Sequence, residues 1–415
     1  MIKEAAAGEI QFPSWGAGGG FFSLYRNYLM NYFYFVFLFL PFIALIAQPV
    51  KDPEQRRQAY RANLDQLRKE WKTVRDLPDI PFFLFGMGNR RKLIYKDGEL
   101  KDALTGERIA KWPVATEIIV PSEYLVHLKT ADGRTVQIQE DEKGVYVWEN
   151  GKRKAISESS LQLPSFGSSK YGPVLKVLHH EVLINVNKGK PVPNFFVYQK
   201  PWNRDATLMG MVMKETGNLH LIKDWILQLR DPFDRNNHGI SEADNPGEVL
   251  FLLSLVTDQN HPLVKITLDS VRQFQKENYI AGQTDYAQHP VFQTKWMKYG
   301  LRSLGLPDPY QIPDVPDSYS SLFWWDFKDQ HVTGKRFGGN TGQLYPYLVW
   351  AEDHFYGERN GAMTNRDYPL SWESKASDAY YPGLQILDKR FTELKLSAPH
   401  TWHAAEMFLL LKELK

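Results

Sequence analysis

The spacing of hydrophobic residues changes twice along the chain, and each change predicts a different kind of structure. From residue 52 to 77 apolar side chains recur every three or four positions, the period of an amphipathic helix, and prolines follow. From 92 to 156 apolar and polar residues alternate around Asp97-Gly98, Asp132-Gly133 and Asn150-Gly151, which are turn pairs typical of antiparallel hairpins. Beyond residue 164 the helical spacing returns and continues to the C-terminus.

The C-terminal part predicts about ten to twelve short helices joined by loops that are alternately short and long. They include residues 205–216, 219–229, 246–257, 262–276, 291–304, 318–327, 343–356 and 401–415. Paired helices with one elaborate edge favour a toroid of helical hairpins, with a binding site on that edge. We therefore expect a mainly α protein, an (α/α) toroid preceded by a small antiparallel β module and an N-terminal apolar helix.

The N-terminal segment 27–50 carries no charged residue. It is long enough for a membrane-spanning helix of about 20 residues and for the shorter apolar region of a signal peptide. Basic residues follow it, which argues against an anchor that leaves the C-terminal part outside the cell, so we favour cleaved export. Both interpretations predict an extracytoplasmic protein, whether periplasmic, secreted or membrane-anchored, and an uncleaved segment would make the membrane a partner.

These patterns divide the chain into four parts. We expect a signal peptide or membrane anchor at 1–50, a helical stalk or linker at 51–90, the β module at 91–163 and the catalytic toroid at 164–415.

Composition narrows the possible partners and chemistry. Lysine and arginine number 50 against 48 acidic residues, so the net charge of +2 predicts no large field for binding nucleic acid. The chain has no cysteine, which excludes disulfides, thiolate metal sites and a cysteine nucleophile.

Clusters of polar and aromatic residues stand directly before several apolar helical runs. They occupy residues 202–205, 244–248, 284–289, 316–319, 365–373 and 399–406. Any one of them has a structural explanation, such as Asn203 as an N-cap before Asp205, or Asp317 or Ser318 as an N-cap. If these six helix starts converge at one place, they would instead form a binding site.

The residue types in these clusters suit a sugar. Aromatic rings offer flat apolar faces, and carboxylates, amides and imidazoles offer hydrogen bonds and protons. We therefore expect an oligosaccharide or polysaccharide as the ligand.

Neither of two metal-like motifs has the spacing that a metal site requires. Residues 231–239 are rich in oxygen ligands but lack the spacing of an EF-hand, so a turn with Asx hydrogen bonds is favoured. His400, His403 and Glu406 do not form the His-Glu-x-x-His motif of zinc enzymes. We predict no metal and no cofactor.

Two of the clusters resemble a known family. Trp202-x-Arg204-Asp205-Ala206 before an apolar helix resembles the start of the first inner helix in glucoamylase-like glycosidases of the six-hairpin (α/α)6 class. Residues 242–247 are similar to the start of the second inner helix of that class. The resemblance covers about half of the chain, and it implies that Arg204 and Asp205 hold the terminal sugar.

The leading hypothesis is a glycoside hydrolase that uses two carboxyl groups. We expect Glu248 to be the general acid and Glu406 the base, with Asp205 and Asp285 as substitutes. The residues expected to bind the sugar are Trp202, Arg204, Asp244, His289, Tyr319, Trp372, Glu373, His400, Trp402 and His403.

Two alternatives remain open at this point. A polysaccharide lyase or sugar epimerase would use His400 or His403 with Tyr319 to move a proton beside a uronate carboxylate. A non-catalytic glycan-binding or envelope protein would use the same clusters only for recognition.

Overall fold

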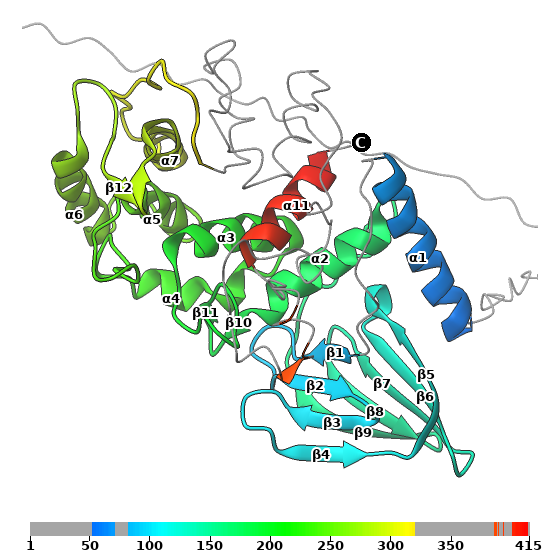
Figure 1. The fold of residues 1–415 in the computed structure, drawn as a ribbon. Coiled ribbons are helices and arrows are strands. Elements are labelled where there is room, and N and C mark those ends of the chain that lie inside the picture. The colour runs from blue at the N-terminus through cyan, green and yellow to red at the C-terminus, as the bar shows by residue number, and fades with distance from the viewer. Residues whose placement is uncertain are drawn as a thin grey trace, which may run out of the picture. The chain divides into compact units, whose positions relative to one another are not determined.

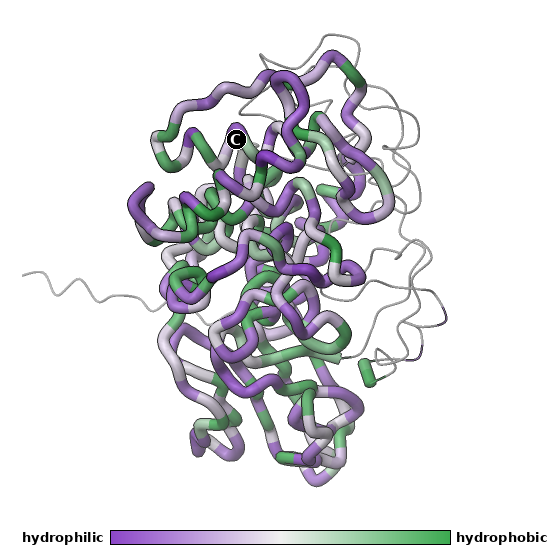
Figure 2. Tube along the Cα trace, turned by 90° about the vertical axis from the view of Figure 1, so that its left-hand side faces the viewer, coloured by the Kyte–Doolittle hydropathy of each residue, from purple (hydrophilic) through white to green (hydrophobic). Residues whose placement is uncertain are grey.

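Two antiparallel sheets and a row of helices share one hydrophobic core in the computed structural model of the chain (Figure 1). The structure describes residues 52–70, 82–319, 386, 387, 389, 393 and 401–413. By its internal contacts the chain divides into Met1–Val50 and Lys51–Lys415, and the second unit contains every described element. Figure 2 shows hydrophilic stretches along the outer loops of this unit.

Nine strands between residues 82 and 158 form the two larger sheets. The four-stranded sheet has the order β1 (Phe82–Phe85), β2 (Leu93–Lys96), β3 (Glu99–Asp102) and β4 (Arg108–Lys111). The five-stranded sheet has the order β5 (Val114–Val120), β6 (Leu125–Thr130), β7 (Thr135–Glu140), β8 (Gly144–Glu149) and β9 (Lys152–Glu158), with the 3-10 turn η1 (Pro121–Glu123) between β5 and β6.

The tight turns of these sheets follow from their sequence. Asp97 and Gly98 join β2 to β3 with φ angles of 50° and 74°, and Asn150 and Gly151 join β8 to β9 with 51° and 75°. Two successive left-handed residues match the twist of the flanking strands, and Asp-Gly and Asn-Gly adopt this conformation readily. The predicted hairpins are therefore present at both places.

A buried ion pair ties the two sheets together. Glu140 at the end of β7 accepts hydrogen bonds from the backbone N–H groups of Gly86 (2.9 Å) and Met87 (2.7 Å), in the loop after β1. The guanidinium of Arg90 lies 2.9 Å from the same carboxylate, and both side chains are fully buried. Because a buried carboxylate is stable only when its oxygens are paired, this loop is held against the five-stranded sheet.

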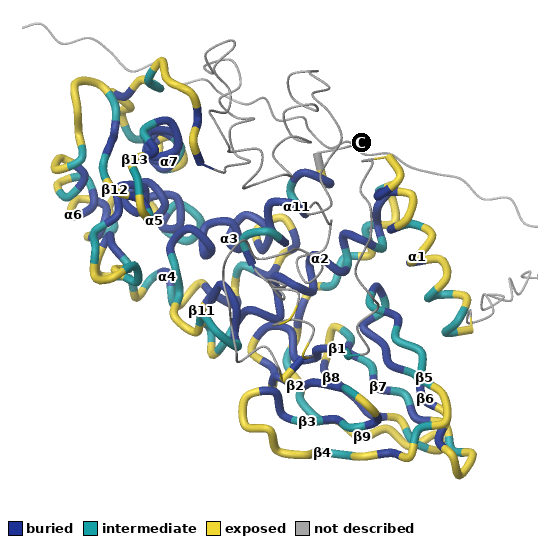
Figure 3. Tube along the Cα trace, in the orientation of Figure 1, coloured by how far each residue is buried: buried dark blue, intermediate teal, exposed yellow. Residues whose placement is uncertain are grey.

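The helices lie beside the sheets in a row. Helix α1 (Pro53–Glu70) packs on β5 and on α2 (Gly172–Ile184), and α11 (Thr401–Glu413) packs between α2 and α3 (Asn203–Thr216). Helix α3 contacts α5 (Asn245–Ser254), which contacts α6 (Pro262–Val271) and α7 (Pro290–Ser303). Figure 3 shows α2, α3, α5 and α7 as largely buried, whereas α1 and α6 carry exposed faces.

Short elements fill the connections between these helices. A 3-10 turn η2 (Leu219–Leu221) and a one-turn helix α4 (Lys223–Leu227) follow α3, and η3 (Arg272–Phe274) follows α6. Two small hairpins pair β10 (Val186–Asn187) with β11 (Lys190–Pro191), and β12 (Gln283–Thr284) with β13 (Ala287–Gln288).

The prediction of a mainly α fold with an (α/α) toroid is wrong. The described residues form eight α-helices and 13 strands in four antiparallel sheets, which is a mixed α/β fold. Helical spacing identified α3, α5, α6, α7 and α11, but the predicted helix at 219–229 is broken into η2 and α4. The error arose because periodicity locates a helix and carries no information about its neighbours, so pairing into hairpins was assumed.

Several predictions fall on residues outside the described ranges. They are the apolar segment 27–50, the helix at 343–356 and most of the helix at 318–327. Among the helices that the structure does describe, none has the length and apolar character needed to cross a bilayer. The division into four domains stays a prediction.

Helices α5 and α7 approach each other closely through two glycines. A β-carbon added to Gly247 would lie 2.4 Å from the backbone nitrogen of Met297, and one added to Gly300 would lie 2.4 Å from the carbonyl oxygen of Gly247. Backbone atoms cannot move aside as a flexible side chain can. This contact fixes the start of α5 relative to α7.

Gly247→Ala and Gly300→Ala should therefore each destabilise the protein by about 1–3 kcal/mol, although alanine favours a helix by about 1 kcal/mol. Urea unfolding measures the effect. Gly210→Ala is the matched control, because its β-carbon would meet only the end of the Leu255 side chain at 2.7 Å, which can rotate away. Wild-type stability in both α5 and α7 variants would contradict the close backbone contact.

Candidate functional site

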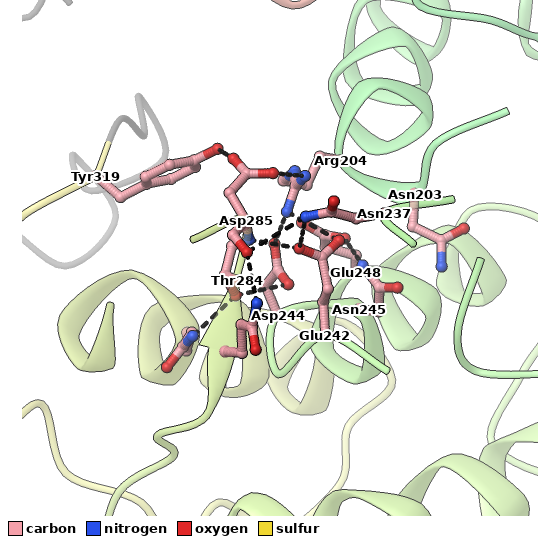
Figure 4. A network of polar contacts seen from close by, with 12 residues as sticks. Asn203, Arg204, Asn237, Glu242, Asp244, Asn245, Glu248, Thr284, Asp285 and Tyr319 are labelled. Atoms are coloured by element: carbon pink, nitrogen blue, oxygen red, sulfur yellow. Dashed lines mark hydrogen bonds and ion pairs between the residues drawn. The ribbon is translucent and has the colours of Figure 1, made fainter. Parts of the chain in front are cut away.

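Arg204, in the first turn of α3, is surrounded by three carboxylates from two other segments (Figure 4). Its Nη1 lies 3.0 Å from Asp244 and 3.4 Å from Glu242, both just before α5, and its Nη2 lies 2.8 Å from Asp285. The arginine side chain is only 4% exposed. A buried guanidinium needs such partners, so α3, the start of α5 and the β12–β13 hairpin are held together here.

Asp285 occupies the turn of the β12–β13 hairpin and is the most accessible of the three carboxylates, at 26% exposure. Its φ angle of 52° is left-handed, a conformation that Asp tolerates better than most residues. One carboxylate oxygen pairs with Arg204, and the other accepts a hydrogen bond from the hydroxyl of Tyr319. Hydrogen-bond donors thus hold both oxygens of the accessible Asp285 carboxylate in position.

Neutral side chains complete the buried end of the cluster. Asp244 accepts a hydrogen bond from the hydroxyl of Thr284 at 2.9 Å, and Gln293 of α7 donates to the same hydroxyl at 2.8 Å. Asn237 donates to Glu242 and to the carbonyl of Asp285, both at 3.3 Å. Helix α7 and the loop after α4 thereby fix the hairpin.

A second chain of hydrogen bonds joins the starts of α3 and α5. Asp234 accepts from the backbone of Asn203 at 2.8 Å, and Asn245 accepts from the backbone of Asp234 at 3.2 Å. The amide of Asn245 donates to Glu248 Oε2 at 3.1 Å. Glu248 is fully buried, and within the described structure its Oε1 has no hydrogen-bond partner.

Helix α11 brings its first turn to the same place. The carboxyl of Asp205 accepts a hydrogen bond from the backbone N–H of Trp402. The Trp402 ring packs edge-on against Tyr319, with centroids 5.6 Å apart. The guanidinium of Arg204 lies 5.4 Å from the centre of the Trp202 ring and 6.0 Å from that of Tyr319. The rings of Trp202 and Tyr319 therefore lie beside the Arg204 guanidinium.

Two ring nitrogens beside Tyr319 are buried without a partner among the described residues. One is Nε2 of His289, whose ring lies 4.5 Å from that of Tyr319 and whose Nδ1 contacts Ser318 at 2.9 Å. The other is Nε1 of Trp402. Buried polar atoms are usually paired, so each of these nitrogens is available to a hydrogen-bond partner beyond the described residues.

Burial controls the protonation of the carboxyl groups around Arg204. It raises the pKa of Glu248 well above the usual value, and the charge of Asp244 raises it further. Burial likewise raises the pKa of Glu242 and Asp244, although Arg204 opposes the effect. Burial would lower the pKa of Arg204, but Tyr319 and the carboxylates raise it well above its ordinary value.

Burial also shifts the pKa of Asp205 and of His289, which belong to the same cluster. Burial raises the pKa of Asp205 to about 7, although the neighbouring Arg204 lowers it. Burial lowers the pKa of His289 to about 4, so its ring is neutral at pH 7. The cluster thus contains a carboxyl that holds a proton near neutral pH and a neutral imidazole.

The structure brings nine of the predicted site residues into this cluster. They are Trp202, Arg204, Asp205, Asp244, Glu248, Asp285, His289, Tyr319 and Trp402. Glu406 and His403 lie on α11, where Glu406 is buried and His403 is partly exposed. Trp372, Glu373 and His400 lie outside the described residues.

The explanation of Asn203 as an N-cap is wrong. Trp202 is the N-cap of α3 and makes no side-chain capping bond, while Asn203 is the first helical residue. Asp317 pairs with Lys295 and also accepts a hydrogen bond from the backbone N–H of Tyr319, and most of the helix that it was expected to cap lies outside the described residues. Asp231 and Asp234 accept hydrogen bonds from backbone groups two residues later, as expected for Asx turns. In the described part of the chain no three acidic or histidine side chains are arranged to hold a metal ion.

Two polar side chains of α7 stand out in the sequence just after the cluster at 284–289, but they were not among the predicted site residues. Gln293 and Lys295 are fully buried and face the cluster residues Thr284 and Asp317. The available signal was a pair of long polar residues inside an otherwise apolar helical run, which requires buried partners.

Comparisons of the chain with protein-family models, with curated proteins and with solved structures find no match. The resemblance to six-hairpin glycosidases is therefore wrong, because no family match supports it and the mixed α/β fold contradicts the toroid it implied. Short motifs at two helix starts were not specific enough to identify a family.

Asp205→Asn tests the electrostatics of the cluster. A carboxyl whose pKa is raised on folding contributes stability at low pH that is lost as pH rises, here between about 4 and about 7. An asparagine side chain does not titrate, so the variant loses no stability at this position as pH rises. The stability of the variant minus that of wild type should rise by about 2 kcal/mol between pH 5 and 7, and stay constant above pH 8.

Urea unfolding at several pH values provides the measurement. Asp269→Asn on α6 is the control, since the pKa of that exposed carboxyl is lowered, mainly by its hydrogen bond to Lys265, and it does not titrate in this range. A stability difference for Asp205→Asn that does not vary with pH would show that Asp205 is ionised in the folded protein.

Proposed function

We propose that this protein is a glycan-active enzyme, a glycoside hydrolase whose reacting groups gather around Arg204. The observation that carries the proposal is the presence in one cluster of Asp285, an accessible carboxylate oriented by Arg204 and Tyr319, and of buried carboxyl groups whose pKa is raised, to about 7 for Asp205. Glycoside hydrolysis needs one ionised and one protonated carboxyl. We further propose, from the apolar segment 27–50, that the enzyme acts outside the cytoplasm.

Asp285 is the best candidate for the base or nucleophile. Glu406, which the sequence suggested for this role, is 1% exposed, whereas Asp285 is reachable from solvent. Arg204 and Tyr319 hold its two oxygens, so little reorganisation is needed when charge develops on the sugar.

Asp205 is the stronger candidate for the general acid, and Glu248 is the substitute. The pKa of Asp205, about 7, suits proton donation at neutral pH. Asp205 is buried at 4% exposure, and Glu248 is fully buried and bonded to Asn245. Glu248 would then influence the charge of the site from its buried position.

The surroundings of these groups suit a polyhydroxylated ligand. Among the described residues the ring nitrogens His289 Nε2 and Trp402 Nε1 have no hydrogen-bond partner, and sugar hydroxyls would satisfy them. Trp202 and Trp402 are partly exposed, and Tyr286 at the tip of the β12–β13 hairpin is 74% exposed. Such rings offer apolar faces to a sugar.

The charge of the cluster favours a hydrolase over a uronate-directed lyase. A lyase must neutralise the uronate carboxylate of its substrate. Arg204 already faces three carboxylates, so an added anion there would be repelled. We therefore expect a neutral or amino sugar as the substrate.

Activity of the full-length protein on a panel of neutral, amino and uronate polysaccharides tests the proposal. We expect new reducing ends from neutral or amino glycans and no ultraviolet-absorbing product. Asp285→Asn and Asp205→Asn should each lower kcat/KM by about 10² to 10⁴, because each removes a general acid–base or nucleophilic group. Glu248→Gln should lower it less.

Asp269→Asn again provides the matched control, since it neutralises a surface carboxylate on α6, and its activity should equal that of wild type. Melting temperatures establish that each variant is folded. Wild-type cleavage by both Asp285→Asn and Asp205→Asn would refute the assignment. An unsaturated product would favour a lyase, and calorimetric binding without turnover would favour a glycan-binding protein.

A further inference from the structure

Residues 306–319 follow α7 and run back along it. Three side chains of this segment, those of Asp308, Asp317 and Ser318, contact α7 or the residue at its start. We call this segment the α7 strap. Lys298 contacts Asp308 at 2.6 Å and the carbonyl of Tyr310 at 2.7 Å. Lys295 lies 3.3 Å from Asp317, and His289 at the start of α7 lies 2.9 Å from the hydroxyl of Ser318. The strap ends at Tyr319, whose hydroxyl donates to Asp285.

The Lys295–Asp317 pair differs from the other fastenings because both side chains are fully buried. An ion pair taken completely out of water adds little net stability, since desolvation offsets the attraction between the charges. Lys298 and Asp308 are more accessible, at 9% and 28% exposure. Stability alone therefore does not explain why a charged pair occupies the buried position.

The pair does have a geometric consequence two residues away. Asp317 contacts Lys295 through Oδ2, and its Oδ1 accepts a hydrogen bond from the backbone N–H of Tyr319 at 3.2 Å. The orientation of this carboxylate thus determines where the Tyr319 backbone lies. From there the Tyr319 ring packs edge-on against Phe292, with centroids 4.8 Å apart, and reaches Asp285.

We propose that Lys295 and Asp317 are positioning residues, whose ion pair directs Tyr319 so that its hydroxyl holds the Asp285 carboxylate in its reacting orientation. This inference rests on the proposed function for the role of Asp285. Neither residue touches substrate, and both act through Tyr319. The strap thereby connects the buried face of α7 to the accessible end of the cluster.

A double-mutant cycle on kcat tests the proposal in the full-length protein. Lys295→Met and Tyr319→Phe should each lower kcat by about tenfold or more while changing KM by less than about threefold, because they affect the reacting carboxylate. Combined, they should lower kcat no further than the larger single effect, since Lys295 acts through Tyr319. Independent, multiplying effects would overturn the proposal.

Lys298→Met is the matched control, because it removes another lysine from α7 that holds the same strap. It should leave kcat within about twofold of wild type and should multiply independently with Tyr319→Phe. A loss of kcat as large as that of Lys295→Met would show that any loosening of the strap suffices, and would overturn the specific role of the buried pair.

Lys295→Met also leaves the Asp317 charge buried without its partner, which alone can unfold a protein. Lys295→Met combined with Asp317→Asn removes both charges and should fold with near-wild-type stability. It should still show the loss of kcat, because the asparagine is no longer oriented by a lysine. Wild-type kcat in this folded variant would overturn the proposal.

Hydrogen exchange separates this inference from the proposed function. Lys295→Met should speed exchange of the Tyr319 amide, which Asp317 protects, whereas Lys298→Met should affect residues 306–310 instead. Unchanged exchange at Tyr319 would overturn the positioning role. Faster exchange in a protein that cleaves no glycan would support the positioning of Tyr319 and count against the glycosidase.

Discussion

The arrangement of the site depends on the charge of Arg204. Its guanidinium is the shared partner of Asp244, Glu242 and Asp285, which come from segments 38 residues and more away along the chain. Removing this cation would leave buried carboxylates facing one another, a state that is strongly unfavourable in a medium of low polarity. The starts of α3 and α5 and the β12–β13 hairpin therefore have to meet where they do.

The same crowding divides the acidic side chains into two functional classes. Burial raises the pKa of Glu248, Asp244 and Asp205, which favours the protonated form of each group. Asp285 differs because it lies at the accessible end of the cluster, between the guanidinium and the Tyr319 hydroxyl. One cation among many carboxyls thus brings buried groups of raised pKa and an accessible carboxylate into the same cluster, an arrangement that suits acid–base chemistry.

Part of this could be predicted from sequence because it depends on local rules. Asp97-Gly98 and Asn150-Gly151 define hairpin turns by their own conformational preferences, and helical spacing located α3, α5, α7 and α11. The polar helix starts also indicated residues that converge, since buried Arg204 and Asp244 require partners. What could not be predicted is which elements are neighbours. The packing of α11 between α2 and α3 joins residues far apart in sequence, and periodicity contains no information about it.

Hydrogen exchange of an Arg204→Met variant tests the central claim most directly. We expect the amides at the starts of α3 and α5 and in the β12–β13 hairpin all to lose protection together, while the five-stranded sheet β5–β9 keeps its protection. These segments share no other cation in the described cluster. Loss of protection confined to the first turn of α3 would contradict the claim that Arg204 assembles the site.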